Sequence, residues 1–356
     1  MMKQINTIGW DIGGAHVKAA VLNSEAEVVA VYQEPCPLWK GLEQLRIAVH
    51  NIQQKVAVLD YYHAITMTGE LVDFFEDRND GVKQISATML TLLSPRRCLF
   101  YAGATGFLES NQIDATHYQA IASANWLASA SVAAKKRCGG LFVDIGSTTT
   151  DILLFQQGRV QAQGYTDYQR LISQELIYTG IIRTAVMAVA QTAVDQNQVI
   201  GIMAEYFATM ADVYRVTEEL DERHDQTESA DGAEKTTIAS ARRLSRMIGS
   251  DFYPEELPRW RQFAENIRAQ QLQKIQQACE LKLQTVDCSK PHSVIGAGVG
   301  RFLVKQMAQN LGCDYIDFSE LMQQATKPIG LAVADCAPAV AVAWLSREIM
   351  ATDDTF

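Results

Sequence analysis

The stretch that decides the fold of this chain is Leu141-Phe142-Val143-Asp144-Ile145-Gly146-Ser147-Thr148-Thr149-Thr150-Asp151-Ile152-Leu153-Leu154-Phe155. Two apolar runs flank Gly-Ser-Thr-Thr, and an aspartate stands at the end of the first run. This pattern predicts a buried strand, a tight turn and a second buried strand. The N–H groups of such a turn suit phosphate oxygens, and the aspartate can hold a divalent cation that neutralises them. Taken alone, the stretch also fits an ordinary hairpin turn capped by polar side chains.

The same pattern occurs near the N-terminus, in Ile8-Gly9-Trp10-Asp11-Ile12-Gly13-Gly14-Ala15-His16-Val17-Lys18-Ala19-Ala20-Val21-Leu22. Again a short apolar strand ends in Asp-Ile-Gly, turns, and returns as an apolar strand. Two such hairpins, each opening one half of the chain, predict a duplicated α/β domain with one site between the halves. We expect an N-terminal domain over residues 1–137 and a C-terminal domain over residues 138–356.

Composition narrows the class of protein. A chain of 356 residues can form two cores, and its hydrophobic fraction of 48% is ordinary for a soluble globular protein. A net charge of -10 argues against nucleic acid or an anionic membrane as partner. No leader and no apolar run of membrane-spanning length is visible. The cysteines form no Cys-x-x-Cys pair, which favours reduced thiols in the cytoplasm over a disulfide scaffold or a zinc site: Cys36, Cys98, Cys138, Cys279, Cys288, Cys313 and Cys336.

Hydrophobic periodicity predicts the other elements. A three-stranded meander is expected over residues 5–33, and a strand over residues 64–68 delivers Gly69 and Glu70 at its C-terminal end. Ligand-contacting residues sit at such strand ends in open α/β sheets. Further strands are expected over residues 98–101 and 159–163. Helices are expected over residues 42–55, from about 72, from 114 or 116 to 135, and over 169–195, 199–220, 258–284 and 337–349.

Residues 218–237 stand out because Glu, Asp and His dominate them. The composition predicts a solvated loop or a partly disordered insert. The following helix carries Arg242, Arg243 and Arg246, which could clamp a diphosphate. They could equally pair with the acidic segment, and the sequence does not separate the two interpretations.

Four side chains near the predicted turns are candidates for chemistry. Glu70 could bind metal or act as a general base toward a hydroxyl, or it could be a helix N-terminal glutamate favoured by the dipole. Lys18 could reach a phosphate or point to solvent, and His16 could donate to a phosphate or be an exposed turn residue. Asn125, placed in the middle of a helix, is a candidate polar contact to the site.

A third glycine pattern lies in Ser293-Val294-Ile295-Gly296-Ala297-Gly298-Val299-Gly300-Arg301. It reads as a strand, a glycine loop and the start of a helix. No βαβ unit with an acidic ribose partner follows it, so we exclude a Rossmann oxidoreductase. After two Asp-Ile-Gly hairpins, Gly296, Gly298 and Gly300 fit the third motif of the actin-like ATPase, sugar kinase and Hsp70 superfold. Kinases of this superfold usually carry Thr or Ser in the first phosphate turn, where this chain has Ala15 and His16.

Together the motifs resemble the hydantoinase/oxoprolinase branch of that superfold, and within it the group tied to tetrahydromethanopterin-linked one-carbon metabolism. The resemblance runs nearly the whole length of the chain. It rests on the residues at 9–16, 66–71 (Thr-Met-Thr-Gly-Glu-Leu), 125–126 (Asn-Trp), 143–151, 175–180 (Glu-Leu-Ile-Tyr-Thr-Gly) and 240–244 (Ser-Ala-Arg-Arg-Leu).

The resemblance implies two ribonuclease-H-like domains with a cleft between them. Methanogen members of the group are methanofuran-pathway synthases, which join an aminomethylfuran-methyl diphosphate to the phenol of γ-glutamyltyramine and release diphosphate. The same role here implies a methanofuran or methylofuran product and small-molecule partners. The sequence leaves the oligomeric state open, with a homo-oligomer among the options. The alternatives are an ATP-dependent small-molecule kinase, an amide-ring hydrolase, and a non-enzymatic ATP-sensing or assembly protein. In these alternatives the ligand is ATP.

The implied site combines both turns. Mg²⁺ would lie on Asp11 and Asp144, and Glu70 would be the base for the phenol. Arg242, Arg243 and Asn125 would be substrate contacts. The diphosphate would contact Gly13, Gly14, His16, Lys18, Gly146, Ser147, Thr148 and Thr149.

Overall fold

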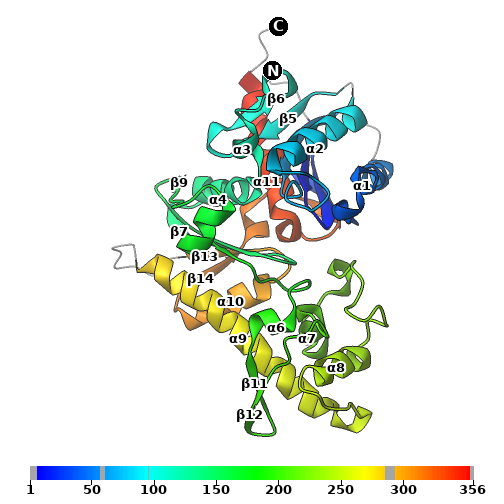
Figure 1. The fold of residues 1–356 in the computed structure, drawn as a ribbon. Coiled ribbons are helices and arrows are strands. Elements are labelled where there is room, and N and C mark those ends of the chain that lie inside the picture. Colours follow the sequence, from blue (N-terminus) through cyan, green and yellow to red (C-terminus); the bar gives the residue numbers. More distant parts are fainter. Residues whose placement is uncertain (1–5, 57–60, 95, 285–292, 353–356) are drawn as a thin grey trace. The chain divides into compact units, whose positions relative to one another are not determined.

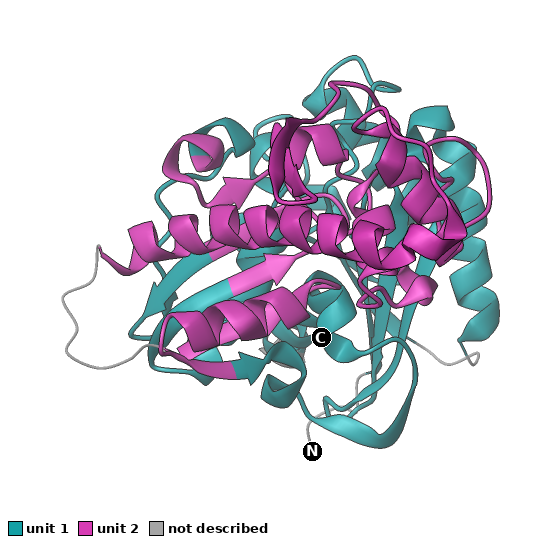
Figure 2. Ribbon diagram, turned by 90° about the horizontal axis from the view of Figure 1, so that it is seen from below, with its two compact units in different colours: residues 1–142, 153–169, 316–356 teal, residues 143–152, 170–315 magenta. Residues whose placement is uncertain are grey.

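The computed structural model describes residues 6–56, 61–94, 96–284 and 293–352. The predicted first residue of the meander, Ile5, and one of the cysteines, Cys288, lie outside these residues. The chain separates into two compact units (Figure 2). Unit 1 comprises residues 1–142, 153–169 and 316–356, and unit 2 comprises residues 143–152 and 170–315. The boundary expected between residues 137 and 138 stays a prediction about the duplication.

Unit 1 is built on a seven-stranded sheet (Figure 1). The predicted meander is confirmed, because β1 pairs with β2 and β2 with β3, both antiparallel. β4 lies parallel to β1 on its other side. The strand order is β15 (Gln324–Gly330), β3 (Val28–Pro35), β2 (His16–Leu22), β1 (Asn6–Ile12), β4 (Tyr61–Met67), β5 (Cys98–Tyr101) and β6 (Phe107–Glu109).

Helices cover both faces of this sheet. Trp10 shares a buried cluster with residues of α1 (Leu42–Lys55) and α2 (Arg78–Leu93), which therefore lie on one face. The neighbouring Gly9 faces the opposite side, where α11 (Ala337–Thr352) packs. A Cβ atom on Gly9 would lie 1.9 Å from the carbonyl oxygen of Ala339, so only glycine permits this approach. Because side chains alternate along a strand, Asp11 points to the α11 side as well.

The second sheet contains the other hairpin. Its order is β10 (Leu176–Ile177), β8 (Thr150–Gln156), β7 (Gly139–Ile145), β13 (Ser293–Ala297) and β14 (Asp314–Asp317), with β9 (Arg159–Val160) also paired to β8. In unit 2, the long helix α9 (Leu257–Leu283) packs against α7 (Met210–Val216), α8 (Thr237–Arg246) and the hairpin strand β11 (Thr192–Asp195). α10 (Arg301–Asn310) packs on β13. The strand–turn–strand pattern thus occurs in both sheets, as predicted.

Several predicted helices are wrong. Residues 169–195 and 199–220 form α5 (Asp167–Ser173), β10, α6 (Val186–Val189), β11, β12 (Gln198–Gly201) and α7 instead. Gln196 and Asn197 have positive φ angles of 47° and 64° and form the tight turn between β11 and β12, which a helix cannot contain. No helix begins near residue 72, since α2 begins at Arg78, capped by the side chain of Asp77.

The helix expected to end at residue 135 is broken in two. α3 (Tyr118–Ile121) ends before α4 (Asn125–Lys136) begins. Between them Ser123 has a φ of 47°, in the left-handed region. Hydrophobic periodicity is silent about such a break, because apolar residues continue on both sides of it.

The remaining helical turns are short. They are η1 (Leu38–Lys40), η2 (Gly103–Thr105), η3 (Ser110–Gln112), η4 (Glu222–His224), η5 (Pro254–Glu256), η6 (Phe318–Leu321) and η7 (Val333–Cys336). Within the described ranges, no helix combines the length and the apolar character that a bilayer crossing requires.

Candidate functional site

The first turn joins β1 to β2 in unit 1. Gly13 N donates to His16 O at 2.9 Å and closes the turn. Asp11, 6% exposed, is paired in register with Lys18 of β2 on one side and with Thr66 of β4 on the other. Residues paired in register point to the same face of a sheet. The side chains of Lys18 and of Asp11, the candidate metal ligand, therefore point to the same face of the sheet.

The two strand neighbours of Asp11 are partly or fully buried. Lys18 Nζ donates to the carbonyl oxygen of Asp335 at 3.3 Å, so Lys18 does not simply point to solvent. Thr66 is fully buried, and its Oγ1 has no hydrogen-bond partner among the described residues. The sequence analysis did not single out Thr66, because a threonine inside a strand is unremarkable without its register.

The end of β4 lies directly against the first turn. Thr68 N and Gly69 N both donate to Ile12 O at 2.9 Å. A Cβ atom on Gly69 would lie 3.2 Å from Gly13 O, so glycine allows the close approach. The structure therefore brings the Gly69–Glu70 segment to the first turn, as expected for the C-terminal end of a parallel strand.

The first turn is covered by the chain that follows β3. Cys36 N donates to Ala15 O at 2.8 Å, and Leu38 N donates to Gly14 O at 3.0 Å. His16 is only 6% exposed, so the interpretation of His16 as an exposed turn residue is wrong. His16 is buried because it pairs with Pro35 at the end of β3. The sequence pattern predicted that this strand ends earlier, at residue 33.

The second turn has the same closure. Gly146 N donates to Thr149 O at 2.9 Å, which matches the Gly13–His16 bond of the first turn. Asp144 is 9% exposed at the end of β7. A Cβ atom on Gly180 would lie 2.4 Å from Thr148 N, so the backbone of this glycine packs directly against the turn. The sequence analysis quoted Gly180 within a family motif but assigned it no role.

The third glycine loop lies against this second turn within unit 2. Gly300 N donates to Ile145 O at 2.8 Å. Gly298 has a φ of 77°, and a Cβ atom there would lie 2.3 Å from Asp144 Oδ1. A Cβ atom on Gly296 would lie 2.6 Å from Tyr315 Cε2, so this glycine serves packing. The loop ends at the first turn of α10, whose N-terminal dipole favours an anion.

An arginine that the sequence analysis missed also reaches the second turn. Arg183 N donates to Ser147 O at 2.9 Å, and the guanidinium Nη1 lies 3.5 Å from Thr148 Oγ1. Arg183 is half-buried. No local pattern marks this residue, because it lies 35 positions beyond the turn that it contacts.

Opposite charges occupy equivalent positions after the two turns. Lys18 follows Asp11 by seven residues, and Asp151 follows Asp144 by the same interval. Asp151 Oδ1 accepts a hydrogen bond of 2.7 Å from Arg170, whose side chain is 2% exposed. The second turn is thus backed by a buried ion pair.

Glu70 is fully buried and lies in unit 1. Its Oε1 accepts a hydrogen bond of 2.6 Å from Ser123 Oγ, while its Oε2 has no hydrogen-bond partner in the described part of the chain. Burial raises the pKa of the Glu70 carboxyl, although the Ser123 hydrogen bond and the charge of Arg78 act to lower it. Since α2 begins only at Arg78, Glu70 is not a helix N-terminal residue. A buried carboxyl with a raised pKa is typical of a general base or acid.

Asn125 begins α4 and does not lie in the middle of a helix. Its Oδ1 accepts a hydrogen bond of 2.7 Å from Trp126 N, so the side chain stabilises the start of the helix. Its role as a substrate contact stays a prediction.

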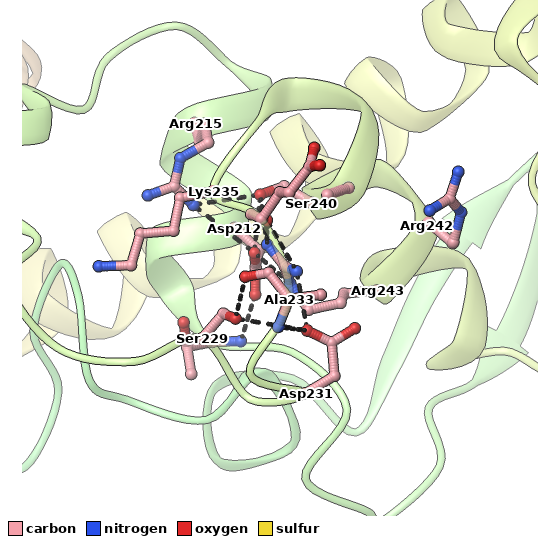
Figure 3. A network of polar contacts seen from close by, with 12 residues as sticks. Asp212, Arg215, Ser229, Asp231, Ala233, Lys235, Ser240, Arg242 and Arg243 are labelled. Atoms are coloured by element: carbon pink, nitrogen blue, oxygen red, sulfur yellow. Dashed lines mark hydrogen bonds and ion pairs between the residues drawn. The ribbon is translucent and has the colours of Figure 1, made fainter.

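The acidic segment 218–237 is a loop with one short helical turn, η4, and most of its residues are exposed or half-buried, as expected for a solvated loop. Asp231 accepts from Arg246 at 3.0 Å. Arg243 pairs with Asp231 at 3.0 Å and with Asp212 at 2.8 Å (Figure 3). Arg243 is fully buried. Arg243 therefore pairs with the acidic segment, which is one of the two interpretations that the sequence leaves open. Arg242 points away from this network and is exposed (Figure 3).

Metal-binding groups are sparse. Within the described residues, no group of three or more His, Cys, Asp or Glu side chains is arranged to hold a metal ion. Mg²⁺ commonly binds through one or two carboxylates together with substrate phosphates and water. Asp144, near the end of β7 before the second turn, offers a carboxylate of this kind.

Comparison with known proteins agrees with these motifs. The hydantoinase/oxoprolinase family model matches residues 62–340. The chain belongs to the hydantoinase/oxoprolinase family. It is 30% identical over 251 residues to a (4-{4-[2-(gamma-L-glutamylamino)ethyl]phenoxymethyl}furan-2-yl)methanamine synthase of Methanocaldococcus jannaschii, covering 70% of this chain and 73% of the relative. A synthase of the same name from Methanococcus vannielii is 32% identical over 116 residues, covering 33% of this chain and 51% of that protein.

The fold of this family member is also found in a solved structure. A chain of acetone carboxylase in its nucleotide-free state matches with a TM-score of 0.60 at 10% identity, covering 96% of this chain and 70% of that one. This likeness concerns the fold alone. The predicted fold class, that of the actin-like ATPase superfold, and the predicted family are both confirmed. The curated relatives are enzymes by name, which supports an enzymatic role.

Proposed function

We propose that this protein is a synthase of methanofuran-type cofactor biosynthesis. Its substrates would be an aminomethylfuran-methyl diphosphate and the phenol of a glutamyl-tyramine or tyrosine-type acceptor. One observation carries the proposal. The chain is 30% identical to a synthase whose name contains the phenoxymethyl-furan ether, and the match covers 73% of that synthase. We also place the reaction in the cytoplasm, where reduced cysteines are expected.

The reaction breaks one bond and forms another. The carbon–oxygen bond between the furan methylene and the diphosphate breaks, and both electrons leave with the diphosphate. The furan ring stabilises the positive charge at the methylene. The phenol oxygen then bonds to that carbon and gives up its proton, which leaves a neutral ether.

The second turn is suited to the departing diphosphate. The hydroxyls of Ser147 and Thr148 and the Arg183 guanidinium, whose Nη1 lies 3.5 Å from Thr148 Oγ1, offer donors and positive charge at this turn. Each well-placed donor to the developing negative charge contributes about 3–4 kcal/mol, by analogy with oxyanion sites. Asp144 would hold Mg²⁺, and the ion when bound supplies further positive charge for the diphosphate.

Glu70 is the candidate base for the phenol. Its buried carboxyl has a raised pKa and one oxygen without a partner in the described residues, which suits proton uptake from a hydroxyl. General base catalysis typically contributes a factor of about 10²–10⁴ to the rate.

A second candidate function is an ATP-dependent kinase or a hydantoinase/oxoprolinase-type hydrolase. The family membership and the likeness to acetone carboxylase, whose reaction is described as ATP-dependent, favour it. The first turn counts against it, because Ala15 and His16 replace the hydroxyl residues usual in kinases of this superfold.

The test is a direct assay of the purified full chain. Furan-methyl diphosphate, a tyramine-containing acceptor and Mg²⁺ should yield diphosphate and the ether in equal amounts. Asp144→Asn should fold and lose about 10²–10³-fold in rate, whereas Asp251→Asn, at an exposed aspartate, is the matched control. Turnover of ATP without ether formation would overturn the proposal and favour the kinase or hydrolase. Nucleotide binding without any turnover would favour an ATP-sensing protein.

A further inference from the structure

A single hydroxyl in unit 1 lies between two carboxyl groups. Ser123 Oγ is 2.6 Å from Glu70 Oε1 and 3.4 Å from Asp167 Oδ2. Asp167 is held in turn by Arg78, whose Nη2 lies 2.5 Å from the same Oδ2. A serine hydroxyl donates one proton and accepts others. It can therefore donate to only one of the two carboxyl groups at a time, and it can accept a proton from the other.

The backbone that presents Ser123 is strained. Ser123 adopts the left-handed conformation in the gap between α3 and α4, where the sequence predicts an uninterrupted helix. Non-glycine residues in this region cost of order 1–3 kcal/mol and tend to cluster at functional sites. In a continuous helix the chain would not have this conformation at Ser123.

Glu70 is held from the other side by α2. A Cβ atom on Gly81 would lie 2.4 Å from Glu70 O, so α2 packs directly on the Glu70 backbone. The backbone of Glu70 is thus fixed, and its carboxyl is oriented by the Ser123 hydrogen bond at Oε1. Only Oε2 is left for a substrate hydroxyl.

Exposure to solvent increases along the chain of groups. Glu70 is fully buried and Ser123 is 8% exposed, whereas the side chain of Asp167 is 21% exposed. Arg78 is more exposed still. The groups therefore connect a buried carboxyl to the surface of unit 1.

We propose that Ser123 and Asp167 form a proton relay that returns Glu70 to its ionised form after each turnover. The inference deepens the proposed function, because it rests on Glu70 as the base for the acceptor hydroxyl. It adds Ser123 and Asp167 as residues that act through Glu70.

The relay conserves every proton. Glu70 Oε2 takes the proton of the substrate hydroxyl, and rotation of the carboxyl about Cγ–Cδ carries that proton toward Ser123. Glu70 then donates to Ser123 Oγ while the Ser123 hydroxyl proton passes to Asp167 Oδ2. Asp167 releases the proton to water, and the hydroxyl turns back toward Glu70.

The charged groups that act on Glu70 are Arg78 on α2 and Asp167 at the start of α5. Loss of the Ser123 hydrogen bond should raise the pKa of Glu70, and loss of the Asp167 charge should lower it. The two variants Ser123→Ala and Asp167→Asn should therefore move this pKa in opposite directions and yet slow proton release in both cases. A merely structural role would not combine these effects.

The experiment follows the Glu70 carboxyl itself in the full chain. Its protonation is measured by difference infrared spectroscopy, with Glu70→Gln to assign the band, first by pH titration and then after a pH jump. Ser123→Gly accompanies Ser123→Ala, since glycine accepts the left-handed backbone. The matched control is Ser129→Ala, which removes a buried hydroxyl of α4 without a hydrogen-bond partner in the described residues.

We expect deprotonation after the jump to slow at least about tenfold in Ser123→Ala, Ser123→Gly and Asp167→Asn, but not in Ser129→Ala. Small buffers such as imidazole should restore the rate in Asp167→Asn, because the missing group is the one nearest solvent. Deprotonation as fast as in the control would overturn the relay. This measurement needs no substrate, so absence of ether formation in the wild type would refute the proposed function separately.

Discussion

The two Asp-Ile-Gly turns are closed by the same backbone hydrogen bond but differ in nearly all the residues that contact them. Each is closed by the same glycine-to-carbonyl bond, at 2.9 Å in both. The first is clasped by the ends of β3 and β4 and contains no serine or threonine. The second presents the hydroxyls of Ser147 and Thr148 and lies between Gly180 and the third glycine loop. The two turns are thus closed in the same way, while the side chains that could contact an anion are concentrated at the second turn.

The sharpest contrast is between Lys18 and Asp151, and substitution of Asp151 should have the largest effect on stability. Asp151→Asn removes the carboxylate to which Arg170, with a side chain 2% exposed, donates at 2.7 Å. We expect the free energy of unfolding to fall by about 3 kcal/mol, since removing one partner of a buried ion pair is strongly destabilising. Urea denaturation of the variant measures this. A loss below 1 kcal/mol would mean that the two positions do not differ as described.

Glycine substitution tests whether the third loop is fitted to the second turn. Gly298→Ala adds both left-handed strain and a collision with Asp144 Oδ1, and should cost at least about 2 kcal/mol of stability. Gly312→Ala is the control, because its φ is 66° and no atom lies within 4 Å of the added Cβ. It should cost about 1 kcal/mol. Equal losses in thermal denaturation would remove the steric argument.

The first turn has a buried acid beside it, which has a pH signature. Burial raises the pKa of Glu70 in the folded protein above its value in the unfolded chain. The folded state therefore binds the proton more tightly, and stability falls as the pH rises above the unfolded pKa of about 4.3. Glu70→Gln removes this penalty, so its stability relative to the wild type should be greater near pH 8 than near pH 4.

Urea denaturation across this pH range measures the difference. A gap between Glu70→Gln and the wild type that does not change with pH would contradict a raised pKa. The variant should also lose most of the synthase activity, because an amide cannot take up the phenol proton.

The smallest effect is expected for the lysine of the first turn. Lys18→Met should weaken binding of inorganic diphosphate roughly tenfold, or about 1.4 kcal/mol, if the first turn contributes a cation to the site. Lys327→Met, at an exposed lysine of β15, controls for the change in net charge. Isothermal titration calorimetry with Mg²⁺ present gives both values. Equal affinities would confine diphosphate binding to the second turn.

The sequence predicts those parts that depend on local patterns. Both hairpins, α1, α9 and the third glycine loop follow from periodicity and glycine placement, and their bounds agree within a few residues. The left-handed break at Ser123 was missed because apolar residues continue through it. Arg183 was missed because its partner lies 35 residues away. The sequence left the pairing of Arg243 with the acidic segment open, because composition does not reveal that Arg243 is buried beside Asp231.

The residues of the candidate site also fall into those that a local pattern reveals and those that it does not. Asp11, Asp144 and the turn glycines are recognisable from a repeated motif. The groups that tune them, such as Thr66, Ser123 and Asp167, come from distant parts of the chain and are identified only by register and tertiary contact. Where propensity and structure disagree, at Ser123, the structure places a hydroxyl on the candidate base, in line with the tendency of strained residues to gather at functional sites.

The pairing of β15 with β3 has a consequence for how the protein is made. β3 ends at Pro35, but its outer edge is paired by residues 324–330, and the face of β1 is covered by α11. At typical translation rates of about 5–20 residues per second, the first strands would wait roughly 15–60 s on the ribosome for these partners. During that interval an apolar sheet face and an unpaired strand edge are open to wrong pairing.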